Sequence, residues 1–181
     1  MKDLAEVARF HEEKLRPIKL FLTDVDGVLT DGRIYWAGEE VGFGRFFSAY
    51  DGHGLRIMKG AGLKLGIISG GHSLGLLERA KTLTVDFVKT GNEDKRQGYL
   101  DIVKECGLCD HEVLYIGDEF FDIPLLKRVG FSAAPPHADP EVKAVCDHVT
   151  FRPAGLGCVR EITDLVRLAQ GIDPHVADFS D

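Results

Sequence analysis

Short apolar runs alternate with helix-like spacing along most of the chain. The runs that predict strands are Ile18–Thr23, Leu63–Ile68, Val85–Lys89, Val113–Ile116, Phe131–Ala134 and His148–Phe151. The intervening stretches that predict helices are Gly54–Ala61, Ser73–Leu83, Lys95–Glu105, Ile123–Val129, Pro140–Cys146 and Val159–Ala169. Several strand runs are apolar on both faces, which is typical of a parallel sheet covered by helices. The pattern therefore predicts an α/β sandwich with right-handed crossovers.

Residues 33–50 depart from this alternation. Ile34–Trp36 is aromatic and β-prone, a turn is indicated near Gly38, and Val41–Phe47 continues the β-prone character. We expect a β-hairpin that projects from the sheet. Because a two-stranded ribbon cannot bury this much apolar surface alone, it should pack against something, such as another subunit.

The length of 181 residues suits one domain, which we place at residues 18–171 between an N-terminal helix (1–17) and a C-terminal tail (172–181). A net charge of −7 argues against non-specific nucleic-acid binding. We see no signal-peptide pattern and no apolar run of about 18 residues, so we expect a cytoplasmic protein without a membrane partner.

Cys106 and Cys109 form a lone C-x-x-C motif, while Cys146 and Cys158 stand apart. A structural zinc site usually needs two such pairs, and His111 would add only a third ligand. Reduced thiols are therefore the favoured interpretation.

Chemically active side chains follow the predicted strands, where ligands bind in an open parallel sheet. These residues are Asp24 and Asp26, Ser69 and Gly70, Lys95, and Asp118 and Asp122. Each one alone has an ordinary explanation as a cap or turn residue. A catalytic site is favoured by the order of these residues along the chain, which is D-x-D-G, then Ser-Gly, then Lys, then G-D-x-x-x-D.

Phosphoryl transfer has a use for each residue type. Asp24 and Asp26, two apart in an extended segment, point to the same side, so one can attack phosphorus while the other moves a proton. Asp24 and Asp118 suit the oxygen shell that Mg²⁺ prefers. Ser69 and Lys95 would neutralise phosphate oxygens.

Four segments carry a resemblance to a known family. They are similar to the four motifs of haloacid-dehalogenase-like phosphatases. The first is the D-x-D-G string that starts at Asp24, and the others are Ile67–Gly70, Gly91–Lys95 and Tyr115–Asp118. More narrowly, residues 18–171 resemble the 3-deoxy-D-manno-octulosonate 8-phosphate phosphatase family, including the glycine-rich closing segment Ala154–Glu161.

The resemblance implies a Rossmann-like three-layer sandwich in which the Asp24 strand is central to a five-stranded core. It implies that Asp24 is the nucleophile and that Asp26 is the general acid/base. Asp24, the Asp26 backbone carbonyl and Asp118 would hold Mg²⁺, with Asp122 either a ligand or a support for the ligands. Ser69, Gly70 and Lys95 would bind phosphate. The reaction would release phosphate from an octulosonate ester.

The spacing of the motifs leaves no room for a cap domain, since a hairpin and a few elements use up both insertion points. Capless members resemble tetramers in which each hairpin helps to cover a neighbour's site, so we expect a homotetramer.

The chain also departs from the family pattern. Relatives that act on the octulosonate typically carry arginines where this chain has Gly71 and Leu156, and Glu119 replaces an aspartate. His72 is a substitute substrate contact or an ordinary helix-start histidine. The substrate could therefore be another sugar-acid phosphate, such as a nine-carbon one. A phospho-accepting receiver domain and a non-catalytic oligomerisation module are the alternatives from other classes.

Overall fold

The computed structural model describes residues 3–174 of the chain. Its core is a six-stranded parallel sheet with the order β5-β4-β1-β6-β7-β8. The strands are β1 (Leu20–Thr23), β4 (Lys64–Ser69), β5 (Phe87–Thr90), β6 (Val113–Ile116), β7 (Phe131–Ala134) and β8 (His148–Val149). All six lie within or overlap the runs predicted from sequence, and β8 adds a short edge strand to the expected five-stranded core.

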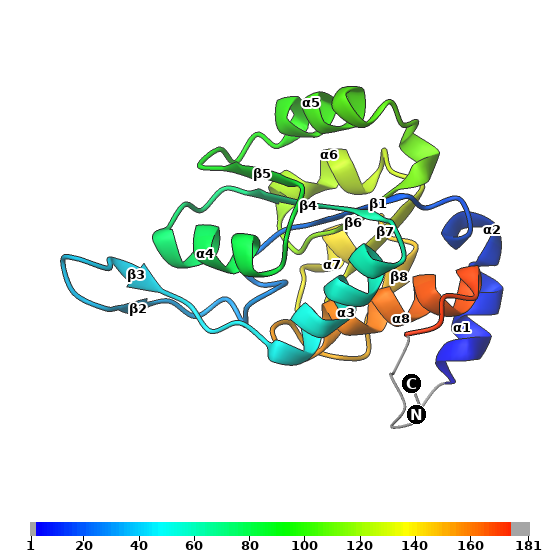
Figure 1. Ribbon diagram of the computed structural model, residues 1–181, viewed down its shortest axis with the longest axis horizontal. Helices are drawn as coiled ribbons and strands as arrows, with labels where there is room; N and C mark the ends of the chain where they lie inside the picture. Colours follow the sequence, from blue (N-terminus) through cyan, green and yellow to red (C-terminus); the bar gives the residue numbers. More distant parts are fainter. Residues whose placement is uncertain (1–2, 175–181) are drawn as a thin grey trace, which may run out of the picture.

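Helices cover both faces of this sheet. On one side lie α1 (Leu4–Phe10), α2 (Glu12–Leu15), α3 (Ala49–Gly60), α4 (Leu74–Thr82) and α8 (Cys158–Gln170). On the other side lie α5 (Arg96–Cys106), α6 (Ile123–Leu126) and α7 (Pro140–Lys143). Figure 1 shows α5 and α6 over one face and α3 and α8 over the other. The three-layer α/β sandwich is thus confirmed.

The period of two along the strands explains the two cores. In β1, Phe21 packs into the cluster under α3 and α8, whereas Leu20 and Leu22 pack into the cluster under α5 and α6. All three side chains are fully buried. A strand whose two faces both meet helices needs apolar residues at every position.

The predicted hairpin is present and projects from one end of the molecule (Figure 1). Its antiparallel strands, β2 (Tyr35–Trp36) and β3 (Phe43–Gly44), are two residues each. The boundary after it was predicted wrongly, because α3 begins at Ala49 rather than at Gly54. Ser48 caps the helix by accepting a hydrogen bond from the Asp51 N–H at 3.2 Å.

Gly54 lies inside α3 because the helix packs closely against α8. A Cβ at this position would lie 2.3 Å from the Thr163 hydroxyl oxygen. The glycine therefore reflects a tight helix–helix contact and does not mark a helix end.

No helix among residues 3–174 combines the length and the apolar character needed to cross a bilayer. The expected cytoplasmic location stays a prediction. Residues 175–181 of the expected tail lie outside the described range. The four cysteines form no disulfide, and within the described residues none belongs to a cluster of potential metal ligands.

Candidate active site

Asp24 follows β1 and is held at the carboxyl edge of the sheet. Its N–H donates to the Ile116 carbonyl at 2.9 Å, which extends the β1–β6 ladder by one residue. Its Oδ1 accepts from the Val25 N–H at 2.6 Å, and the residue is 3% exposed. Burial raises the pKa of Asp24 to about 7, although the nearby ammonium of Lys95 opposes the shift.

Lys95 immediately precedes α5 and its side chain is fully buried. Its Nζ lies 2.8 Å from Asp24 Oδ2, 2.5 Å from Asp122 Oδ1 and 3.1 Å from the Tyr115 hydroxyl. A buried ammonium is stable only when it is paired in this way. These contacts place a fixed positive charge beside the expected nucleophile.

Asp122 is fully buried and each of its oxygens already has two partners. Oδ1 accepts from Lys95 and from the Tyr115 hydroxyl, which is 2.5 Å away. Oδ2 accepts from the N–H groups of Asp118 and Glu119, each at 3.0 Å. This saturation favours a supporting role for Asp122, which orients Lys95 and the loop that carries Asp118.

Asp118 has an oxygen without a partner. Its Oδ1 is buried and forms no hydrogen bond, whereas Oδ2 lies 3.1 Å from His137 Nε2. Burial, and then the charge of Asp122, raise the pKa of Asp118 to about 7. A Cβ on Gly27, which has a φ of +80°, would lie 2.0 Å from Asp118 Oδ2, so only glycine permits this approach of the two loops.

A divalent cation fits this arrangement. Carboxylate oxygens of Asp24, Asp118 and Asp122 lie within 4.8 Å of one another, and Asp118 Oδ1 lacks a donor. A bound cation would offset the burial of these carboxylates and favour their ionised forms.

Ile67–Gly70, the segment that resembles the second family motif, lies at the carboxyl end of β4, which is next to β1 in the sheet. Ser69 ends β4, is 2% exposed, and its Oγ accepts from the Gly71 N–H at 3.2 Å. Gly70 follows it, and a Cβ there would lie 3.1 Å from Glu93 Cγ. His72 is exposed and bonds through Nδ1 to the Thr90 hydroxyl at 2.9 Å.

The ion-pair partner of Asp26 was not predicted from the sequence. Arg45, which follows β3 of the hairpin, donates from Nε to Asp26 Oδ1 at 2.5 Å and from Nη2 to Oδ2 at 2.8 Å. Its Nη1 donates to the Ser73 hydroxyl at 3.1 Å. No periodicity or motif in the hairpin marks Arg45, because the pairing depends on how the end of the hairpin lies against the loop after β1.

Tyr115 and His137 were also missed. Tyr115 lies in an otherwise apolar strand and is fully buried, so its hydroxyl needed an internal partner and was a usable signal. His137 lies in the loop after β7, and nothing in its neighbourhood along the chain connects it to Asp118.

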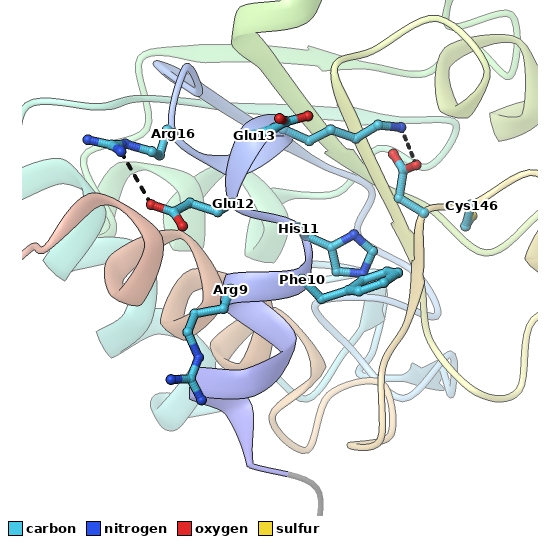
Figure 2. A pocket seen from close by; sticks show the side chains of 9 residues that line it. Arg9, Phe10, His11, Glu12, Glu13, Arg16 and Cys146 are labelled. Carbon is cyan, nitrogen blue, oxygen red and sulfur yellow. Dashed lines mark hydrogen bonds and ion pairs between the residues drawn. The ribbon is translucent and has the colours of Figure 1, made fainter.

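A separate hollow of about 910 Å³ lies where α1 meets α2 (Figure 2). The rings of Phe10 and His11 meet there edge to face with centroids 4.8 Å apart, and Cys146 also lines the hollow. Since α2 leads into the start of β1 and Asp147 directly precedes β8, this hollow lies at the amino ends of the strands. It is therefore at the opposite edge of the sheet from Asp24.

Comparison with known proteins gives a consistent result. Residues 77–157 match the family model described as haloacid dehalogenase-like hydrolase. The 3-deoxy-D-manno-octulosonate 8-phosphate phosphatase of Salmonella typhi is 35% identical over 160 residues, which cover 87% of this chain and 84% of that protein. The enzyme of the same name from Haemophilus influenzae is 34% identical, with 88% of each chain covered.

Solved structures agree with these relatives. The Moraxella catarrhalis 3-deoxy-D-manno-octulosonate 8-phosphate phosphatase, in complex with magnesium, phosphate and KDO, superposes with a TM-score of 0.86. It is 34% identical, and the match covers 90% of this chain and 93% of that one. The receiver-domain alternative is therefore wrong. The chain belongs to the haloacid dehalogenase-like hydrolases, within the 3-deoxy-D-manno-octulosonate 8-phosphate phosphatase family.

Proposed function

We propose that this protein hydrolyses the phosphate monoester of a sugar acid, with 3-deoxy-D-manno-octulosonate 8-phosphate as the first candidate substrate. The observation that carries the proposal is the buried group of Asp24, Asp118 and Lys95 at the carboxyl edge of the sheet. A nucleophile, a metal-ligating carboxylate and a fixed cation are the parts that phosphoryl transfer requires.

In the first half-reaction the Asp24 carboxylate attacks phosphorus. An aspartyl-phosphate bond forms on Asp24 as the bond from phosphorus to the sugar oxygen breaks, and Asp26 gives a proton to that leaving oxygen. Lys95 and the Ser69 hydroxyl offset the charge on the phosphate oxygens.

In the second half-reaction a water molecule attacks the same phosphorus. Asp26, now a carboxylate, takes a proton from the water, and the bond to Asp24 breaks with release of inorganic phosphate. The nucleophile and the acid/base are thereby restored.

Mg²⁺ is the cofactor that these residues suit. Asp24, Asp118 and the backbone carbonyl of Asp26 would hold it, and Asp122 would support that set through the Asp118 loop. When bound, the ion supplies positive charge that neutralises the phosphate oxygens.

The octulosonate ester is the first candidate because it is the substrate in the relatives' name. Two positions, Gly71 and Leu156, differ from the family pattern and keep another sugar-acid phosphate as the alternative substrate. At Gly71 a Cβ would lie 2.8 Å from Asp26 Oδ2, so this chain cannot carry an arginine there without a shift of Asp26. Leu156 is 69% exposed and supplies no charge to a substrate.

The hairpin supports a homotetramer as part of the proposal. Its aromatic side chains are unusually exposed, with Trp36 at 59%, Phe43 at 52% and Phe46 at 64%. A second copy of the chain that packed on this ribbon would bury them and exclude water from the site. Analytical ultracentrifugation of the wild-type protein and of the double variant Trp36→Ser/Phe43→Ser tests this. The wild-type protein should sediment with the mass of a tetramer and the variant with a smaller mass. A monomeric mass for both proteins would contradict the proposal.

The activity is tested by phosphate release from the octulosonate ester beside a panel of sugar-acid and hexose phosphates, with Mg²⁺ present. A kcat/KM of about 10⁴ M⁻¹s⁻¹ or more for one sugar acid, well above the panel, would support the proposal. Asp24→Asn is the control, because it keeps the side-chain shape and removes the nucleophile.

Three outcomes are informative. Efficient release from a different sugar acid would keep the mechanism and change the substrate. An unchanged KM for the true substrate in His72→Ala would exclude His72 as a contact. No release from any ester by the folded, Mg²⁺-loaded protein would favour the non-catalytic oligomerisation module.

A further inference from the structure

Arg45 lies in the active site but has no part in the mechanism above. Its side chain is 9% exposed, while that of Asp26 is 34% exposed. The guanidinium engages both carboxylate oxygens of Asp26 through Nε and Nη2, and it reaches the cap of α4 through Ser73. A nearly buried arginine with this bidentate geometry is fixed in place.

The guanidinium retains binding capacity beyond these bonds. An arginine carries five N–H donors, and the contacts to Asp26 and Ser73 use three of them. The two that remain belong to Nη1 and Nη2. A nearly buried N–H group without a partner costs free energy, so binding of a ligand oxygen to these two N–H groups would be favoured.

The position of Arg45 indicates which part of a substrate it meets. In the proposed mechanism Asp26 faces the oxygen that leaves phosphorus, and Arg45 is in direct contact with Asp26. Arg45 therefore lies on the side of the leaving sugar, whereas Lys95 lies beside Asp24 and is available to the phosphate.

Gly71 makes this arrangement possible. An ideal Cβ at Gly71 would lie 2.8 Å from Asp26 Oδ2 and 3.0 Å from Arg45 Nη2. A side chain at this position would require the ends of the Asp26 and Arg45 side chains to shift. A side chain supplied from residue 71 would therefore compete with Arg45 for the space beside Asp26.

We infer that Arg45 is a specificity-determining residue that binds the carboxylate of the sugar acid while the phosphate is bound at Asp24. The inference rests on the proposed function and goes beyond it by assigning the contact on the leaving-group side. A carboxylate is the acceptor that a planar, two-pronged donor matches best.

The test pairs one change in the protein with one change in the substrate. The sugar-acid phosphate with the highest kcat/KM is compared with its own methyl ester, in which the carboxylate has lost its negative charge and gained a methyl group. Arg45→Met removes the donors, Arg45→Lys keeps a charge without the two-pronged geometry, and Arg33→Met is the control. Arg33 is a hairpin arginine that is 82% exposed and is paired with Asp31.

The wild-type protein and Arg33→Met should prefer the acid over the ester by about 10- to 100-fold in kcat/KM, as expected for hydrogen bonds to a charged group. Arg45→Met should abolish that preference, and Arg45→Lys should keep part of it. Thermal unfolding of each variant establishes that it is folded. If Arg45→Met is not folded, the inference is tested by whether Arg45→Lys loses part of the preference for the acid over the ester.

Three results would overturn the inference. In the first, Arg45→Met lowers kcat/KM equally for the acid and the ester, which means that Arg45 only supports Asp26. In the second, the wild-type protein does not distinguish acid from ester. In the third, its best substrate has no carboxylate. If the wild-type protein hydrolyses no phosphate ester at all, the proposed function itself has failed, and this is seen before any variant is compared.

Discussion

Replacement of Lys95 by methionine removes a fully buried positive charge from the site. Methionine keeps most of the length and volume of the side chain but leaves Asp24 and Asp122 without their shared partner at 2.8 and 2.5 Å. Because both carboxylates are buried, loss of this partner should cost about 3–5 kcal/mol. For a domain of this size that corresponds to a fall of about 6–20 °C in the thermal midpoint.

The loss should depend on pH with a definite sign. The pKa of Asp24 is raised from 3.8 in the unfolded chain to about 7, so between these values the native state binds more protons and stability falls as pH rises. Lys95 lowers the pKa of Asp24 and of Asp118. Without Lys95 both pKa values rise further, so Lys95→Met should lose more stability at pH about 8 than at pH about 5.5.

Thermal unfolding followed by circular dichroism, on protein freed of metal with EDTA, measures this effect. Lys89→Met is the matched control, since Lys89 is 43% exposed and lies 3.6 Å from Asp101. It should change the free energy of unfolding by about 0.5 kcal/mol or less. A loss of stability in Lys95→Met no larger than in this control, or a larger loss at the acid pH, would contradict the expected role of Lys95.

Three further outcomes are expected. Gly27→Ala should displace Asp118 and so raise the Mg²⁺ concentration needed for half-maximal activity. Gly62→Ala is the control and should not change that concentration, because Gly62 has a φ of +93° and no atom within 4 Å of the added Cβ. Equal effects of the two variants would mean that backbone strain alone matters. Tyr115→Phe should lower the free energy of unfolding by about 1–3 kcal/mol in urea titrations because Asp122 loses a buried donor, and an unchanged midpoint would contradict this. EDTA should abolish phosphate release and added Mg²⁺ should restore it, so activity that persists in EDTA would exclude the proposed cofactor.

Local sequence determined the sheet and the order of the motifs. Val113–Ile116 and Phe131–Ala134 are strands with the predicted bounds, because short runs of largely apolar residues between helices have few alternatives to a buried parallel strand. Asp24, Ser69 and Asp118 could be placed at one edge without coordinates, since every parallel strand directs its carboxyl end to the same side.

Only the tertiary structure decided how the site residues are divided between roles. Nothing in the spacing of Asp118 and Asp122 shows that one has a buried oxygen without a partner and the other has four donors. The pairing of Arg45 with Asp26 joins a projecting hairpin to the loop after β1. Such contacts arise from packing between segments distant in the chain, and hydrophobic periodicity describes only which face of each segment is buried.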